Sequence, residues 1–257
     1  MKIIIKIGTN LLTTVKGELD LNNLRQLINQ ISETVKKKHK VIIVTSGAIT
    51  SGAELLKVSL DTIPKKQAAA SIGQLLLMNE YALFFKSHGI QVGQLLLTKD
   101  GLLDKNRKKN ALNTINTLLK YNFIPIINEN DSVTTKEIKF GDNDELSSIV
   151  AVLCKADQYI ILSDINGVYT DDPNQNKKAL LIPQINKITE KIKKNAKKTK
   201  SKYGSGGMIS KLTAAEYAMN HNITVTIANG RNPNVINKIL TNNPIGTTFT
   251  PQKRRIK

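Results

Sequence analysis

Residues 126–131 read Ile126-Ile127-Asn128-Glu129-Asn130-Asp131, and residues 140–147 read Phe140-Gly141-Asp142-Asn143-Asp144-Glu145-Leu146-Ser147. The apolar run 124–127 predicts a buried strand that ends in amides and carboxylates. A second polar set opens a helix predicted over residues 142–155. Because open α/β sheets bind ligands at the carboxyl ends of their strands, we expect a ligand site between these two sets.

A capped helix accounts for only part of this polarity. One side chain, such as that of Asp142, suffices to cap the first helical turn. The apolar residues Leu146, Ile149, Val150 and Leu153 recur at helical spacing and predict the face that packs on the sheet. Capping does not explain the other amides and carboxylates, which are therefore candidates for ligand binding.

The rest of the chain alternates short apolar runs with helical patterns. Strands are predicted at residues 2–7, 41–44, 91–97, 124–127, 159–162, 224–228 and 246–249. Helices are predicted at residues 21–35, 67–85, 106–119, 142–155, 204–219 and 235–240. Small residues in the first half of the helix at 67–85 favour a close contact with another helix or a subunit. This alternation predicts an α/β fold, a mostly parallel sheet covered on both faces.

Composition predicts a single domain over residues 1–257 with a basic tail at 251–257. The 257 residues are 40% hydrophobic and only 4% aromatic, so the core is built from Ile, Leu and Val. No apolar run reaches about 18 residues, so we expect no membrane span, no signal peptide and a cytoplasmic location. The single cysteine, Cys154, is predicted to be buried on a helix. The three histidines are isolated, so no metal site is predicted.

The net charge of +18 raises the question of nucleic-acid binding. Lysines are spread over most helices and are densest at residues 187–202. This segment contains no aromatic residue, and the first one after it is Tyr203. Without aromatic side chains to stack bases, a solvated lysine-rich face or mobile loop is the better interpretation. We therefore expect no nucleic-acid partner.

Two glycine-containing turns lead into helices. Residues 45–52 follow a strand and open a helix, and residues 204–211 open another helix with Lys211 in its first turns, and both arrangements let backbone N–H groups approach an anion. Residues 132–140 suit a small hairpin or lid beside the site. Neither a P-loop nor a dinucleotide-binding fingerprint is present.

Six motifs occur in a fixed order along nearly the whole chain. They are Lys6-Ile7-Gly8-Thr9, Val44-Thr45-Ser46-Gly47-Ala48-Ile49, Pro125-Ile126-Ile127-Asn128-Glu129-Asn130-Asp131, Gly141-Asp142-Asn143-Asp144, Ser163-Asp164-Ile165-Asn166-Gly167-Val168-Tyr169 and Gly206-Gly207-Met208-Ile209-Ser210-Lys211. Together they resemble the glutamate 5-kinases of the amino-acid kinase family. Acetylglutamate kinases, aspartokinases and uridylate kinases are similar at Lys6 and Gly8 but lack the pair of Asn/Asp motifs.

The resemblance implies a three-layer αβα sandwich and the transfer of a phosphoryl group from ATP, with Mg²⁺ on the ATP phosphates, to the side chain of L-glutamate. The product is L-glutamyl 5-phosphate, the first intermediate of proline biosynthesis. A carboxylate acceptor with a pKa near 4.3 is ionised at pH 7, so no general base is needed. Phosphoryl transfer instead needs positive charge around the transferring group.

The resemblance also assigns roles to individual residues. It implies that Lys6 and Lys211 reach the phosphoryl group from opposite sides and that Asp144 holds both ammonium groups. Glutamate-binding positions are Ser46, Asp131 and Asn143, with Asp131 taking the substrate's ammonium. Nucleotide-binding positions are Lys6, Gly8, Gly47, Ser163, Asp164, Ser205, Gly206, Gly207, Met208, Ile209, Ser210 and Lys211. Gly8 and Gly47 are expected to offer backbone N–H groups.

This chain departs from the family at a few places, and the family also implies partners. Ser163 and Ser205 stand where many members have threonine, and the chain ends shortly after Phe249, where many bacterial members continue into a further PUA-type C-terminal domain. A homo-oligomer, feedback inhibition by proline and a glutamyl phosphate reductase partner are implied for the family. The residues alone leave the oligomeric state and proline sensitivity open.

Three functions are compatible with these residues. The first is a glutamate kinase. The second is a kinase of the same fold acting on an acylated amino acid or a nucleotide, against which Asp131 argues because its charge repels a phosphate. The third is a nucleic-acid-binding protein derived from a kinase, suggested only by the net charge and distinguishable by a steep salt dependence of binding.

Overall fold

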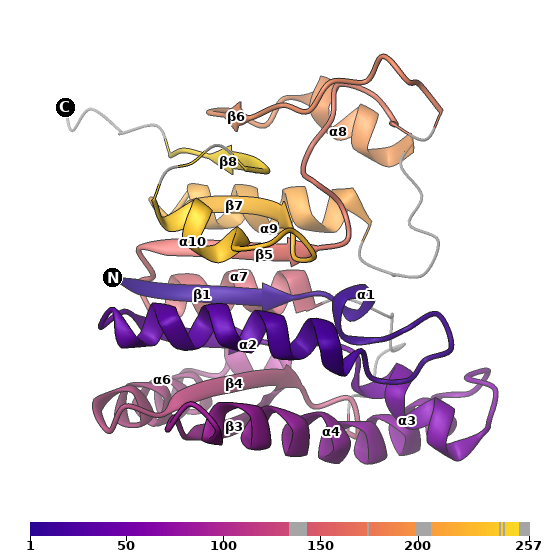
Figure 1. Cartoon of the computed structure of the whole chain (residues 1–257), viewed down its shortest axis with the longest axis vertical. Coiled ribbons are helices and arrows are strands. Elements are labelled where there is room, and N and C mark those ends of the chain that lie inside the picture. The colour runs from indigo at the N-terminus through magenta and orange to yellow at the C-terminus, as the bar shows by residue number, and fades with distance from the viewer. Residues whose placement is uncertain (134–142, 174, 199–206, 242, 244, 252–257) are drawn as a thin grey trace.

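The computed structural model describes residues 1–133, 143–173, 175–198, 207–241, 243 and 245–251 (Figure 1). Its eight strands are β1 (Lys2–Ile7), β2 (Lys40–Val44), β3 (Val92–Leu97), β4 (Ile124–Glu129), β5 (Gln158–Ser163), β6 (Gln184–Ile185), β7 (Thr224–Asn229) and β8 (Thr247–Phe249). All of them belong to one sheet of order β3-β4-β2-β1-β5-β7-β8-β6, in which only the β7–β8 pair is antiparallel. The predicted mostly parallel sheet is confirmed.

Helices cover both faces of the sheet. They are α1 (Thr9–Leu12), α2 (Leu21–Lys36), α3 (Ala48–Leu56), α4 (Ile63–Lys86), α5 (Lys99–Leu103), α6 (Lys105–Lys120), α7 (Asn143–Leu153), α8 (Glu190–Lys198), α9 (Met208–Met219) and α10 (Val235–Leu240). Figure 1 shows α2 and α10 on the near side and α6, α7 and α9 on the far side, which makes three layers. The αβα sandwich is therefore confirmed.

Strand β1 shows how the sequence builds both layers. Successive side chains of a strand point to opposite faces. Ile3, Ile5 and Ile7 accordingly pack against α1, α2, α4 and α10, whereas Ile4 packs in the second cluster with α6, α7 and α9. A strand buried on both faces is mostly apolar, which is why residues 2–7 contain four isoleucines.

Helices α3 and α4 pack with their backbones in contact. A Cβ atom added to Gly52 would lie 1.8 Å from the carbonyl oxygen of Ala69, and one added to Gly73 would lie 1.8 Å from that of Ala48. Only glycine fits at these two positions. The close contact predicted from the small residues of α4 is confirmed as one within the chain.

The lysine-rich segment contains a helix that the sequence analysis missed. Residues 190–198 form α8, whose Ile192 and Ala196 pack against the core, and Lys193 forms an ion pair with Glu216 of α9 at 3.0 Å. The alternative prediction of a mobile loop was therefore wrong for residues 190–198. Lys191 and Lys194 are exposed, as a solvated face requires.

Three other short elements, α1, α5 and β6, were not predicted, since two to five residues carry too little periodicity. Within the described residues, no helix combines the length and apolarity needed to cross a bilayer. Most of the predicted hairpin or lid at residues 132–140, the cap residue Asp142 and the tail at 252–257 lie outside the described residues.

Candidate active site

Three charged side chains meet where the strands end. Lys6 is the penultimate residue of β1, Asp144 is at the start of α7 and Lys211 is in the first turn of α9. The Nζ atom of Lys6 lies 2.6 Å from Oδ1 of Asp144, and Nζ of Lys211 lies 3.2 Å from Oδ2. All three side chains are buried. The structure therefore brings together the three predicted catalytic residues.

Asp144 is ionised in this environment. Burial by itself raises the pKa of a carboxyl group, but attraction and hydrogen bonds from Lys6 and Lys211 outweigh it and lower the pKa of Asp144 below its usual value. The carboxylate thus lies between two ammonium groups, each paired with one of its oxygens. Two buried ammonium groups held this close together favour the arrival of an anion.

A network of side-chain amides surrounds Asn143. Its Nδ2 donates to the carbonyl oxygen of Thr45 at 2.6 Å and to Oδ1 of Asn128 at 2.7 Å, with Oγ of Ser46 at 3.2 Å. The network joins the ends of β2 and β4 to the start of α7. Two predicted glutamate-binding residues, Ser46 and Asn143, are thus in contact. The two N–H groups of Asn143 are already used by protein oxygens.

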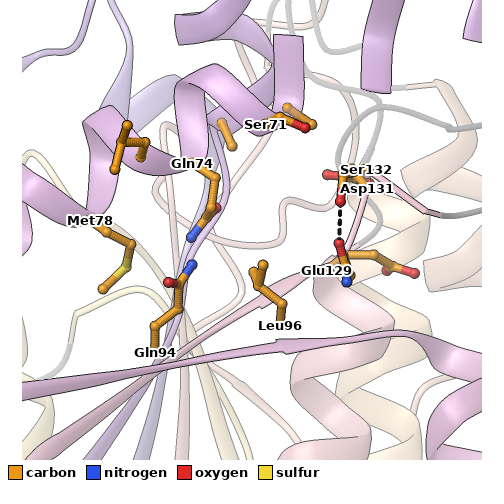
Figure 2. A pocket seen from close by; sticks show the side chains of 12 residues that line it. Ser71, Gln74, Met78, Gln94, Leu96, Glu129, Asp131 and Ser132 are labelled. Carbon is orange, nitrogen blue, oxygen red and sulfur yellow. Dashed lines mark hydrogen bonds between the residues drawn. The ribbon is translucent and has the colours of Figure 1, made fainter. Parts of the chain in front are cut away.

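A cavity of about 320 Å³ opens beside this network (Figure 2). Its lining comes from α4, β3, the start of α3 and the turn after β4, and includes Gln74, Gln94, Glu129, Asp131 and Ser132. Burial raises the pKa of the Asp131 carboxyl group to about 6. No positive partner among the described residues offsets this burial, and a ligand with an ammonium group would supply one.

The predicted nucleotide side is built around the end of β5. Oγ of Ser163 donates to Oδ1 of Asp164 at 3.0 Å, and Nδ2 of Asn10 donates to Oδ2 at 2.8 Å. These bonds hold Asp164 beside the loop that follows β1. Asp164 also lines a second, wider cavity of about 670 Å³ together with Arg231.

The two predicted glycines differ in role. The N–H group of Gly8 donates to the carbonyl oxygen of Leu162 at 3.0 Å and continues the β1–β5 ladder, so this donor is already used by a protein oxygen. A Cβ atom at this position would lie 3.8 Å from Nζ of Lys6. Gly47 has φ of 93° at the start of α3, a left-handed conformation that glycine adopts without strain.

The glycine-rich loop before α9 is described only from Gly207 onward. Met208, Ile209, Ser210 and Lys211 form the first turn of the helix, and Met208 also borders a small cavity of about 50 Å³ beside Val168 and Tyr169. A helix N-terminus is a favourable place for phosphate. The predicted nucleotide-binding residues Ser205 and Gly206 lie outside the described residues.

Two residues of the network were missing from the predicted site. Asn128 belongs to the motif at the end of β4 but was given no role, and Gln74 was not considered. The signal for Gln74 was available: it interrupts a buried stripe of α4 that otherwise contains Ala70, Leu77 and Tyr81. A polar residue in an apolar stripe marks either a buried hydrogen bond or a binding site.

The described residues contain no group of three or more His, Cys, Asp or Glu side chains placed to hold a metal ion. Mg²⁺ is commonly held by phosphate oxygens of a nucleotide with few protein ligands. The donor set of this site is compatible with such a metal and supplies no dedicated cage for it.

Known proteins resemble this chain in sequence and fold. A glutamate 5-kinase of Thermoanaerobacter sp. is 43% identical over 258 residues, which cover the whole of this chain and 69% of that protein. One of Clostridium acetobutylicum is 43% identical over 255 residues, 98% of this chain and 96% of that protein.

Solved structures agree on the fold. A UMP kinase from Bacillus anthracis has a TM-score of 0.66 at 16% identity and covers 98% of this chain and 96% of its own. An isopentenyl phosphate kinase of T. acidophilum has a TM-score of 0.65 at 18% identity over 97% of this chain and 100% of its own. Residues 1–229 match the amino acid kinase family. On this match and on the 43% identity across its whole length, the chain belongs to the amino acid kinase family.

Proposed function

We propose that this chain is a glutamate 5-kinase, which transfers the γ-phosphoryl group of ATP to the side-chain carboxylate of L-glutamate and releases ADP. The product, L-glutamyl 5-phosphate, starts proline biosynthesis. The observation that carries the proposal is the buried cluster in which the Asp144 carboxylate holds the ammonium groups of Lys6 and Lys211, next to a cavity that contains Asp131.

The two lysines act on the transferring group. Their ammonium groups sit on opposite oxygens of Asp144, so both are oriented before any ligand arrives. Preorganised positive charge stabilises the charge that develops on phosphoryl oxygens in the transition state. Mg²⁺ on the ATP phosphates would add to this neutralisation when bound.

The acceptor side is formed by Ser46, Asn143 and Asp131. The amide network around Asn143 ties the end of β2 to the start of α7 and so fixes the distance between the cavity and the lysines. A substrate whose ammonium pairs with Asp131 would extend its other end toward Lys6 and Lys211. Holding the two reacting groups in this way converts a bimolecular step into an effectively unimolecular one.

No general base is proposed, because the acceptor carboxylate has no proton to remove. The low pKa of Asp144 fits a positioning role, since an ionised group that forms two ion pairs is a poor proton acceptor.

The test is ADP release with ATP and Mg²⁺ and a panel of acceptors: L-glutamate, L-aspartate, N-acetyl-L-glutamate and UMP. Hydroxylamine traps an acyl phosphate as a hydroxamate. We expect hydroxamate with L-glutamate alone. Product formed with the acetylated amino acid or with UMP instead would replace the proposed substrate by one of the alternatives.

We also propose that the chain forms a homo-oligomer through β3 and α4. Strand β3 is the outermost strand on its side of the sheet, and Leu75 and Leu83 of α4 and Leu96 of β3 are exposed large apolar side chains. Such edges tend to be covered by a partner. Sedimentation of the wild type and of a Leu75→Glu, Leu83→Glu double variant should give an oligomer and a smaller species, respectively. A wild-type monomer would refute this proposal.

Two further partners follow from the chemistry of the proposed reaction. Proline has the same α-ammonium and α-carboxylate groups as glutamate, so we propose that it competes at the Asp131 cavity. Competitive inhibition by proline against glutamate is the direct measurement.

The acyl phosphate product is reactive in water, which favours its transfer to a glutamyl phosphate reductase. Both ATP and glutamate are metabolites of the cytoplasm, where we propose the enzyme acts.

A further inference from the structure

Gln74 occupies an unusual place on α4. It lies in the buried stripe of that helix, is 9% exposed, and borders the 320 Å³ cavity that also contains Asp131. Its Oε1 accepts a hydrogen bond from Nδ2 of Asn128 at 2.7 Å. Its Nε2 is buried and has no hydrogen-bond partner among the described residues. An unsatisfied buried donor is destabilising, so its presence needs a reason.

Backbone groups determine which end of the Gln74 amide is the nitrogen. The backbone N–H of Glu129 donates to Oδ1 of Asn128, so that atom must be an oxygen. Nδ2 of Asn128 is therefore the donor to Gln74, and the atom of Gln74 that accepts must be Oε1. The carbonyl of Thr45 fixes Asn143 in the same way. Reversing Gln74 would break the bond with Asn128.

The free nitrogen is directed toward β3. Figure 2 shows the nitrogen of Gln74 turned toward the amide of Gln94 on that strand, whereas Asp131 lies at the opposite side of the view. Gln94 is exposed, so its amide can rotate, whereas that of Gln74 is held by Asn128. The cavity thus has a fixed N–H donor on one wall and a carboxylate on another.

These two groups complement an α-amino acid. Asp131 suits an α-ammonium group, and an N–H donor suits an α-carboxylate oxygen. The N–H groups of Asn143 are used by Thr45 and Asn128, so they do not supply this donor. A ligand carboxylate would satisfy the unpartnered nitrogen and remove its desolvation cost.

We propose that Nε2 of Gln74 binds the α-carboxylate of the acceptor substrate and makes the enzyme select α-amino acids over acids that lack this group. The assignment rests on the proposed function, because it adds a contact to the same acceptor site. Asp131 and Gln74 would then read the two charges of the α-carbon, while Lys6 and Lys211 act at the other end of the molecule.

A purely structural role for Gln74 predicts a different result. In that case only its Oε1 matters, as the acceptor that holds Asn128. The variant Gln74→Glu separates the two roles, because a carboxylate still accepts from Asn128 but provides no N–H donor and repels a substrate carboxylate. Asn79→Ala is the matched control, an exposed position of the same helix outside the cavity.

The experiment measures steady-state kinetics at pH 8 with L-glutamate, and inhibition by 4-aminobutyrate, which has the ammonium group but no α-carboxylate. For Gln74→Glu we expect the KM for glutamate to rise about 10- to 100-fold, with kcat within about threefold and the KM for ATP unchanged. 4-Aminobutyrate should inhibit the variant at least as well as the wild type. The two ligands should therefore respond in opposite directions.

Wild-type KM for glutamate in Gln74→Glu, or equal weakening of both ligands, would overturn the proposal. If this variant does not fold, Gln74→Met is used, and the selectivity for glutamate over 4-aminobutyrate should still fall. An unchanged selectivity would again overturn it. If the wild type forms no hydroxamate with glutamate, the proposed function has failed, and calorimetric binding of L-glutamate to the wild type and Gln74→Glu still tests the contact.

Discussion

Two carboxylates of the site have pKa values shifted in opposite directions. The pKa of Asp144 is held below its usual value because two ammonium groups outweigh its burial, whereas burial alone raises that of Asp131 to about 6. Environments that separate the pKa values of neighbouring groups often mark distinct roles in catalysis. In the proposed site, Asp144 keeps a permanent charge that orients the two lysines, whereas Asp131 has a charge that a bound ammonium group would stabilise.

Replacing Asp144 tests its positioning role. Asp144→Asn keeps the shape but removes the charge that anchors Lys6 and Lys211, so kcat should fall by roughly 10²–10³. The KM values for glutamate and ATP should change much less, because the lysines matter most in the transition state. The measurement is kcat against pH for both proteins, and the two profiles should have the same shape. Loss of an acidic limb in the variant would identify Asp144 as a base instead.

Asp131 should make glutamate capture depend on pH. Its carboxyl group is ionised above a pKa of about 6 and neutral below it, so kcat/KM for glutamate should fall up to tenfold per unit as the pH drops below 6. The substrate's side chain, with a pKa near 4.3, stays ionised over most of this range.

The variant Asp131→Asn provides the control. It should raise the KM for glutamate about tenfold or more, leave the KM for ATP unchanged and abolish the limb near pH 6. A rise in the KM for ATP would place Asp131 on the nucleotide side. An unchanged limb would assign the titration to another group.

At the scale of elements, the contact between α3 and α4 positions the acceptor site. Helix α3 begins directly after Ser46 and Gly47, and α4 carries Gln74. Gly52 and Gly73 let the two backbones touch, which brings Ala48 of α3 and Gln74 of α4 to the same cavity. A side chain at either glycine would clash with the backbone of the other helix and force the two helices apart.

Gly73→Ala therefore should reverse the usual effect of this substitution. In an exposed helix, alanine in place of glycine stabilises by about 1 kcal/mol. At Gly73 the added Cβ would lie 1.8 Å from a carbonyl oxygen, so we expect destabilisation by about 1–3 kcal/mol or more and a higher KM for glutamate. Denaturant unfolding measures this, with Asn79→Ala as the control within about 0.5 kcal/mol of the wild type. A stabilised Gly73→Ala would show that the helices can separate at little cost.

Helix α8 could have been found from the sequence. Ile188, Ile192 and Ala196 are spaced by four residues, which is the period of one helical face, and all three pack in the core cluster. The many lysines between them obscured this pattern. The same lysines explain the exposed face, because a helix with one apolar stripe needs polar residues everywhere else.

At the scale of the whole molecule, the net charge of +18 should be largely separate from catalysis. Replacing Lys193, Lys194, Lys197 and Lys198 with glutamine should leave kcat within about threefold, which is less than 1 kcal/mol in activation free energy. Some loss of stability is expected from the broken Lys193–Glu216 pair, which is partly exposed and therefore weak. Activity and thermal unfolding measure the two effects. A tenfold loss of kcat would show that these lysines contribute to the reaction.

The sequence by itself determined the alternation of strands and helices, the parallel sheet and the six motifs. Apolar runs of about five residues and helical periodicity are local properties, so they can be recognised without knowing which elements pack together. Residues 2–7 were predicted as a strand with the bounds that the structure has, and the helix at 235–240 likewise. Lys6, Asp144 and Lys211 were predicted to be neighbours only through the resemblance.

Tertiary structure alone decided how groups far apart in the chain share hydrogen bonds. The N–H of Gly8 was taken by Leu162, which is 154 positions later, because β1 and β5 are adjacent in the sheet. Gln74 borders the cavity because α4 packs against the strand ends. Asn128 bonds only to the oxygen of the Gln74 side-chain amide and leaves its nitrogen without a partner among the described residues. A hydrogen bond depends on distances of a few tenths of an ångström between such segments, and no local pattern of residues encodes them.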